Sequence, residues 1–132
     1  MPTPTPYEDW RKDPVSRAED AASNFGHYLM ACCRAGALKK IASLPAPATK
    51  AEFDAALAQA VDAALFNVTD LLEGFWPTRA GPKHRTEFEL AIRVTDEGGN
   101  VIERIEVSPC MLDLPIGFWR WKEDFERTAN AK

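Results

Sequence analysis

Apolar residues recur at steps of three and four positions along the first third of the chain, which is the spacing of one helix face. Asp13 can cap this helix and Pro14 suits its first position. Gly26 and Gly36 lower helix propensity, so we expect them to mark close packing against a neighbour or a break near residue 36. The apolar positions are Val15, Ala18, Ala22, Phe25, Leu29, Cys32 and Gly36, extended by Ile41 and Leu44 as far as Pro45.

A second helix begins at Thr49 and Glu52, which have the spacing of a capping box. The helical pattern lasts about six turns. It ends before Pro77, because a residue that precedes proline avoids helical angles. A short proline-containing connection between two amphipathic helices predicts an antiparallel pair. The apolar positions of the second helix are Phe53, Leu57, Ala60, Val61, Ala64, Val68, Leu71, Leu72 and Phe75.

The apolar period changes from 3.6 to two after a loop rich in glycine, proline and basic residues (77–85). This alternation predicts a strand with one buried face, a turn at 96–100 and a return strand. An even loop of two or four residues would keep the aliphatic residues of both strands on one face, with Glu103 at its edge near the turn. The inner face is predicted to hold Phe88, Leu90, Ile92 and Val94, then Val101, Ile105 and Val107.

A two-stranded hairpin is marginal alone. It must lie on the helices, gain a third strand from 108–114, or pair with a second copy of the chain through its edge. Beyond Pro115, the aromatic residues predict a short C-terminal helix. The fold class that follows is α+β: an N-terminal antiparallel helical hairpin packed on a small antiparallel β-hairpin or sheet, closed by the aromatic helix. We expect a flexible tail over 1–12 and one domain over 13–128.

The composition is that of a soluble globular protein, with 132 residues, 45% hydrophobic and 27% charged. The N-terminus lacks the basic start and apolar run of a signal peptide, so we expect a cytoplasmic protein without membrane contact. A net charge of -4 argues against nucleic-acid binding, because such proteins carry a basic stripe. An acidic surface suits solubility or a basic protein partner equally well.

Candidate chemistry is sparse. Cys32 and Cys33 are adjacent and the third cysteine, Cys110, leaves an odd count, so we expect reduced thiols and no disulfide framework. His27 is poorly spaced to activate either neighbouring thiol. No zinc-ligand spacing or phosphate-binding glycine loop occurs. The carboxylates of the hairpin, Glu87 and Glu89 among them, are typical of a solvated sheet face. We therefore expect no catalytic residue, no metal and no cofactor.

The most informative motif is Gly-Phe-Trp, which occurs twice, with a further tryptophan close behind the second copy. Large aromatic side chains stabilise cores and interfaces, so the two copies could cap the helix pair or line a groove. Trp119 and Trp121 cannot both face inward on one helix, so at least one should be accessible. The predicted binding residues are Phe75, Trp76, Phe118, Trp119 and Trp121.

Three functions remain open. The first is a non-catalytic protein-binding module of a small acidic bacterial-type protein, similar in role to toxin-neutralising immunity proteins, antitoxins or secretion chaperones. The second is a small-ligand-binding protein or enzyme with an aromatic-walled pocket between helices and sheet, served by His84, Glu103 or Cys110. The third is a homodimer joined through the hairpin edge.

Overall fold

A computed structural model describes residues 17–108 and 113–130. Its first long element is a continuous helix of three parts: α1 (Arg17–Tyr28), the π-helix η1 (Leu29–Arg34) and α2 (Ala35–Ala42). The helix expected in this region is confirmed over these residues. Its expected start at Asp13 and the expected tail of 1–12 lie outside the described residues.

The π-helical segment changes which residues face the neighbouring helix. The sequence predicted a face through Cys32 and Gly36, whereas the structure buries Cys33 and Ala37. Hydrogen bonds in a π-helix span five residues instead of four, so each π turn holds an extra residue. The most buried positions are therefore displaced by one residue from the predicted Cys32 and Gly36, which are half-buried.

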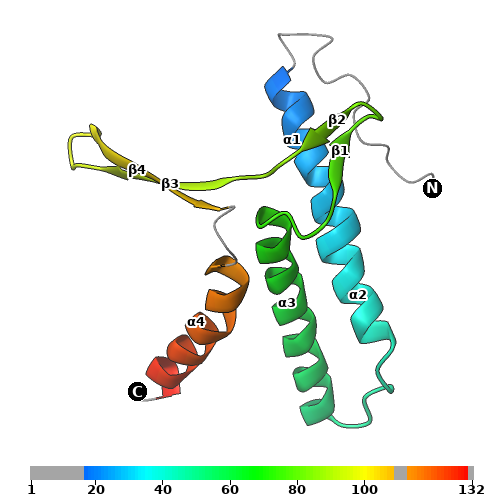
Figure 1. The fold of residues 1–132 in the computed structure, drawn as a ribbon. Helices are drawn as coiled ribbons and strands as arrows, with labels where there is room; N and C mark the ends of the chain where they lie inside the picture. The colour runs from blue at the N-terminus through cyan, green and yellow to red at the C-terminus, as the bar shows by residue number, and fades with distance from the viewer. Residues whose placement is uncertain (1–16, 109–112, 131–132) are drawn as a thin grey trace.

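The second long element, α3 (Lys50–Leu72), begins where the capping box predicted. The Glu52 N–H donates to Thr49 Oγ1 at 3.1 Å, and Glu52 Oε2 accepts from the Ala48 N–H at 2.8 Å. α3 runs back along η1 and α2 (Figure 1), which confirms the antiparallel helical hairpin.

A small hairpin follows α3 in the segment that we expected to be a loop. β1 (Thr78–Ala80) and β2 (His84–Thr86) pair antiparallel. Two side chains of α1 hold this hairpin by the backbone of Arg79: Asn24 Nδ2 donates to its C=O at 2.9 Å, and the Tyr28 hydroxyl accepts from its N–H at 2.9 Å. Strands this short need such ties to the rest of the molecule.

The predicted hairpin is formed by β3 (Leu90–Thr95) and β4 (Val101–Ser108), which we call the arm. Its loop is odd, not even: the Asp96 N–H donates to the Asn100 C=O at 2.9 Å, and Gly99 has a φ of 87°. Ile102 has no partner on β3, and this bulge restores the register so that Ile92 lies opposite Ile105. The prediction for Val101 was wrong, because it lies opposite Thr95, whereas Val107 has no partner in the ladder and is half-buried.

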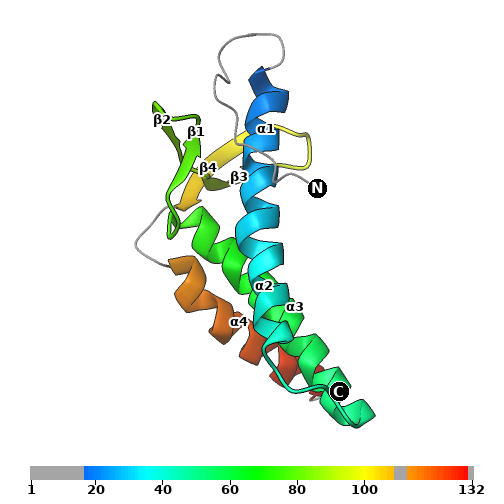
Figure 2. The same cartoon turned by 90° about the vertical axis from the view of Figure 1, so that its right-hand side faces the viewer.

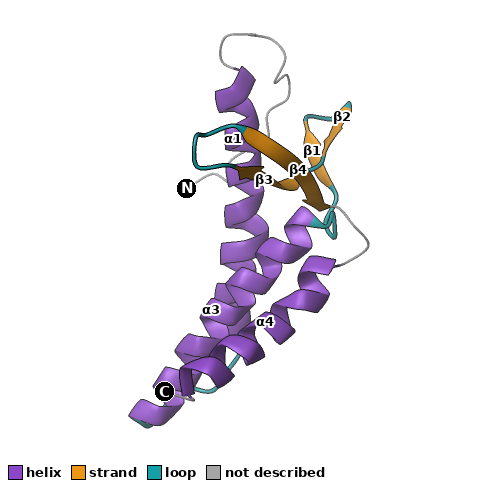
Figure 3. Ribbon diagram, turned by 90° about the vertical axis from the view of Figure 1, so that its left-hand side faces the viewer, coloured by secondary structure: helices purple, strands orange, loops and turns teal. Residues whose placement is uncertain are grey.

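The arm meets the helices at its base and projects away from them (Figures 1 and 3). At the base, the Phe88 ring lies 5.0 Å from that of Phe25 on α1, centroid to centroid. Farther out, Ile92, Val94 and Ile105 are exposed. The packing expected along the inner face is thus confined to the base. A third strand from 108–114 is not tested, since 109–112 lie outside the described residues, and the described strands form two separate pairs.

The chain ends in α4 (Asp113–Asn130), whose 18 residues exceed the short helix expected. Pro115 lies in its first turn, where proline is tolerated. α4 runs beside α3 (Figure 2), and Lys122 Nζ lies 3.5 Å from Asp62 Oδ2 across the two helices. The α+β class, with a helical pair, antiparallel strand pairs and a C-terminal helix, is confirmed.

Little apolar surface is covered by this arrangement. Among the described residues, Leu71 is the largest fully buried side chain. The buried hydrophobic residues are Cys33, Ala37, Leu71, Ala80 and Leu114, whereas seventeen large hydrophobic residues are exposed. Single exposed apolar residues are normal, but contiguous patches indicate an interaction surface.

Candidate functional site

The first Gly-Phe-Trp copy ends a helix. Gly74 has a φ of 75°, its N–H donates to the Leu71 C=O at 3.2 Å, and the Phe75 N–H donates to the Asp70 C=O at 2.9 Å. This is a Schellman motif, in which a left-handed glycine satisfies the last carbonyls of the helix. Phe75 is 67% exposed and meets the half-buried Trp76 edge to face, with ring centroids 5.5 Å apart.

The second copy lies inside a helix. Gly117 is buried in α4, and a Cβ placed on it would lie 2.7 Å from Cε2 of Trp121. The absence of a side chain therefore lets the Trp121 indole lie against the backbone one turn earlier. Trp119 and Trp121 are 52% and 46% exposed. Both are therefore accessible, whereas the helix geometry required only one of them to be.

Phe66 on α3 connects the second copy to the helical hairpin. Its ring centroid lies 5.7 Å from that of Phe118 and 5.5 Å from that of Trp119, which are themselves 4.9 Å apart. Ring pairs at these distances stabilise beyond the area that they bury. Three aromatic side chains from two helices therefore form one cluster.

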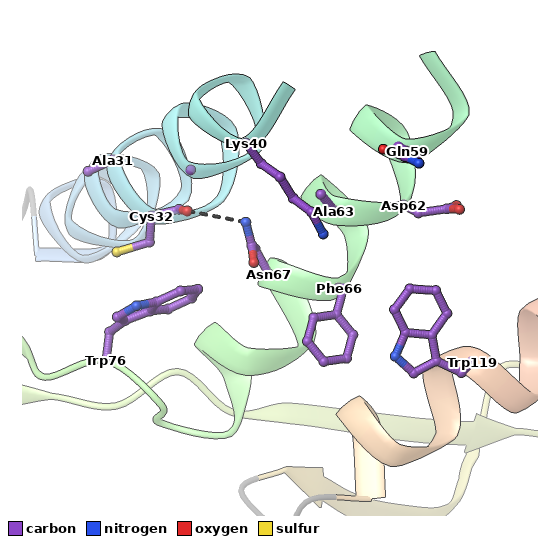
Figure 4. A pocket seen from close by; sticks show the side chains of 11 residues that line it. Ala31, Cys32, Lys40, Gln59, Asp62, Ala63, Phe66, Asn67, Trp76 and Trp119 are labelled. Atoms are coloured by element: carbon purple, nitrogen blue, oxygen red, sulfur yellow. Dashed lines mark hydrogen bonds between the residues drawn. The ribbon is translucent and has the colours of Figure 1, made fainter. Parts of the chain in front are cut away.

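A cavity of about 700 Å³ opens between α2, α3 and the start of α4. Figure 4 shows Trp76 and Trp119 on opposite sides of it, with Phe66 between them and the Asn67 amide near its centre. Lys40 and Asp62 add one charge of each sign. The aromatic-walled pocket expected from the sequence thus lies between helices, not between helices and sheet.

Asn67 fixes the wall of this cavity nearest the π-helix. Its Nδ2 donates to the Cys33 C=O at 3.3 Å and to the Cys32 C=O at 3.5 Å. A Cβ on Gly36 would lie 3.3 Å from the same nitrogen. Gly36 therefore marks close packing, one of its two expected roles, and not a helix break.

Two further hollows beside α3 share Leu65. One is a groove of about 320 Å³ between the first helix and α3, and the other, of about 530 Å³, lies between α3 and α4. Because Leu65 lines both, the exposed apolar side chains around it form one surface across three helices. We call it the Leu65 surface: Met30, Leu38, Val61, Leu65, Trp121 and Phe125.

An ion-pair network joins the helices beside this surface. Lys122 Nζ lies 3.2 Å from Glu126 Oε1 as well as 3.5 Å from Asp62 Oδ2. The hydrogen bond to Glu126 and the charge of Asp62 raise the pKa of Lys122. Lys122 remains cationic between the two carboxylates, so it holds α4 against α3.

By length and composition alone, α3 meets the requirement for a membrane-spanning segment, with a mean hydropathy of 1.2 over its most apolar stretch. Only 11% of that stretch is buried. Two polar residues of α3 contact other helices: Asp62 Oδ2 lies 3.5 Å from Lys122 Nζ on α4, and Asn67 Nδ2 donates to the Cys33 C=O of η1. These two polar side chains are therefore used in contacts with the neighbouring helices.

Four of the five predicted site residues are placed in three locations. Phe118 and Trp119 join in the Phe66 cluster, Trp76 faces Trp119 across the cavity, and Trp121 lies on the Leu65 surface. Phe75 is exposed and does not line the cavity. Sequence reasoning missed Leu65 and Phe66, the two residues of α3 that connect these locations.

The thiols are weak nucleophiles. Burial, with smaller contributions from Cys32 and Asp70, raises the pKa of Cys33 to about 11, and burial also raises the pKa of Cys32. A low thiolate fraction makes a cysteine unreactive. Cys110 lies outside the described residues, and His84 and Glu103 are exposed on separate strands.

Within 17–108 and 113–130, no three residues among His, Cys, Asp and Glu are grouped to hold a metal ion. The comparisons with known proteins add no assignment: no family profile, curated sequence or solved structure matches the chain.

Proposed function

We propose that this chain is a non-catalytic protein-binding module that docks its partner on the Leu65 surface. One observation carries the proposal: exposed apolar side chains from three helices meet at Leu65 in two adjoining hollows. A surface of this kind loses its contact with water when a partner covers it, which is the main favourable term in protein association.

The partner that fits best is an amphipathic helix. Phe53, Leu57, Val61 and Leu65 are exposed at four-residue steps, and this stripe spans about 18 Å along α3. A groove between two antiparallel helices accepts a third helix through its apolar face. Because the chain has a net charge of -4, a partner with basic flanks would associate fastest. Neutralising a toxin or escorting a secreted protein are roles of this type, proposed by analogy.

The test is a quantitative pull-down from the source cells with three forms of the full chain. The double variant Leu65→Ser/Phe125→Ser removes apolar side chains from the docking surface, and Phe125 is 75% exposed, so its loss should leave the fold intact. The matched control is Ile102→Ser, since Ile102 is 67% exposed on the remote arm.

We expect the same protein to be captured by the native chain and by Ile102→Ser and to be lost from the double variant. Capture that is equal for all three forms would show that the partner docks elsewhere. The variant Trp119→Ala/Trp121→Ala then tests the predicted aromatic residues in the same assay.

The cavity supports a second candidate, binding of a small planar molecule. Two indoles on opposite sides offer stacking surfaces, and the Lys40 ammonium favours an anionic group on the ligand. Screening aromatic carboxylates by tryptophan fluorescence and melting temperature tests this candidate. A hit should weaken in Lys40→Met and be unaffected by Lys83→Met, whereas equal binding to both variants would exclude the cavity.

A further inference from the structure

The two outer edges of the arm differ. β4 carries bulges at Ile102 and Val107, whereas all six residues of β3 have a partner in the ladder. Bulges are a common means by which a sheet edge avoids pairing with another strand. Neither edge carries a third strand among the strands that the structure describes. β3 is therefore the edge open to a further strand.

The backbone of β3 presents regularly spaced groups at that edge. The Leu90 N–H donates to Ser108 Oγ at 3.2 Å and the Asp96 N–H donates to the Asn100 C=O at 2.9 Å, so both point toward β4. Backbone groups alternate in direction along a strand. The N–H and C=O groups of Ala91 and Arg93 therefore point outward.

Some charged residues beside this edge have no ion-pair partner among the described residues of one chain. Arg93 lies opposite Arg104, and Arg104 Nη1 forms its ion pair with Glu106 Oε1 at 2.9 Å. Like charges directly opposite each other destabilise a sheet. Arg93 and Glu89 are exposed, and neither forms an ion pair with any described residue. Glu89 directly precedes β3, and alternation continued by one residue puts it on the same face as Arg93.

We propose that β3 pairs antiparallel with β3 of a second copy of this chain, about a two-fold axis at Ala91, to give a four-stranded sheet. In this register Arg93 lies opposite Glu89 of the second copy, and the symmetry makes that pair twice. Moving the axis to Arg93 would set two arginines opposite each other, and moving it to Ile92 would leave Arg93 opposite alanine. The pattern of charges is self-complementary, as a two-fold interface requires.

The same register brings apolar residues together on the other face. Ile92 lies opposite Leu90 of the second copy, and Val94 lies opposite its Phe88. Ile92 and Val94 are exposed in the single chain. Cross-strand aliphatic and aromatic pairs of this kind stabilise a sheet. The second copy thus covers part of the apolar face that the helices leave open.

Sedimentation equilibrium of the full chain over a range of concentrations tests the proposal. The native chain should form dimers, and Arg93→Glu should raise the dissociation constant about tenfold or more, because the introduced carboxylate would face Glu89 of the second copy. The charge swap Arg93→Glu/Glu89→Arg should restore the native constant. Lys83→Glu, which makes the same change in net charge on the turn between β1 and β2, should have no effect.

A backbone variant gives a second, independent measurement. Ala91→Pro removes an N–H that points away from β4, so the arm stays paired while the dimer is lost. Circular dichroism checks that each variant is folded. A native chain that stays monomeric at its highest soluble concentration, or a dimer unchanged by Arg93→Glu and Ala91→Pro, overturns the proposal. Neither result bears on partner capture by the Leu65 surface.

Discussion

The two copies of Gly-Phe-Trp are parts of a longer repeat, Asp-Leu-x-x-Gly-Phe-Trp, at 70–76 and 113–119. The first copy ends α3 and the second begins α4. Gly74 adopts a positive φ that stops a helix, whereas Gly117 continues one and makes room for an indole. The same seven-residue pattern thus ends one helix and begins another.

The comparison also shows what the copies share. Leu71 and Leu114 occupy the same place in the repeat, and both are buried. Glycine is compatible with either end of a helix, so residues outside the repeat decide its role: Pro77 follows the first copy, while Trp121 lies one turn beyond the second. Local sequence identity therefore predicts burial here better than it predicts backbone conformation.

Replacing the buried leucine that the two copies share should have the largest effect on stability. Leu71→Ala and Leu114→Ala should each lower the free energy of unfolding by about 3 kcal/mol, because each leaves a cavity at a buried site. Urea denaturation measures both. Leu72→Ala, at a half-buried neighbour, is the control and should cost less. A loss under about 1 kcal/mol at either buried leucine would show that its copy is not part of the core.

Replacing each glycine by alanine should affect stability differently in the two copies. Gly74→Ala should cost about 1–2 kcal/mol, since a Cβ is strained at a positive φ. Gly117→Ala should change stability by less than about 1 kcal/mol, because the gain in helix propensity offsets the displacement of the exposed indole. Equal losses in urea denaturation would mean that the glycines have the same role.

A double-mutant cycle sharpens the role of Gly117. With Trp121→Ala already present, Gly117→Ala no longer displaces a ring and should stabilise the chain by about 1 kcal/mol. The difference between the two backgrounds measures the coupling of glycine and indole. Additive effects would contradict the close approach of the Trp121 ring to the helix backbone.

An effect that appears only at alkaline pH links the first copy to the π-helix through the charge of Asp70. The pKa of Cys33 is raised to about 11, so the folded state keeps the proton that the unfolded thiol loses. The stabilising contribution is complete below the unfolded pKa near 9 and is lost as pH rises toward 11.

Denaturation at several pH values should therefore show a steeper loss of stability in the native chain than in Cys33→Ala. Asp70→Asn should narrow the pH range over which the native chain loses stability, because it removes one of the charges that raise the pKa of Cys33. Parallel pH profiles for the native chain and Cys33→Ala would disprove the assignment.

Signals that act over a few residues made much of the fold predictable. The capping box at Thr49 and Glu52 placed the start of α3, and alternation placed the arm. The bulge at Ile102 could not be predicted, since no residue type marks it. The predicted loop parity was therefore wrong, although Ile92 and Ile105 lie opposite each other and so share one face. β1 and β2 were missed because long-range hydrogen bonds from α1 hold them.

The candidate site was predictable only in part. Repetition and size singled out the tryptophans, and the accessibility of an indole on α4 followed from helix geometry. Leu65 and Phe66 were missed because they lie within an apolar helix whose other residues have the same character. Their importance comes from the placement of α4, whose contacts with α3 join residues far apart in the sequence, such as Asp62 with Lys122 and Phe66 with Phe118.

The π-helix has a consequence for length variation in this chain. Buried positions on the first long helix are four residues apart from Cys33 in η1 to Ala37 in α2, but nine apart from Asn24 in α1 to Cys33. Removing one residue from 29–34 would convert the π turn to an ordinary helical turn without rotating either flank. A single-residue deletion, which normally turns one half of a helix by about 100°, should be tolerated at this place alone on that helix.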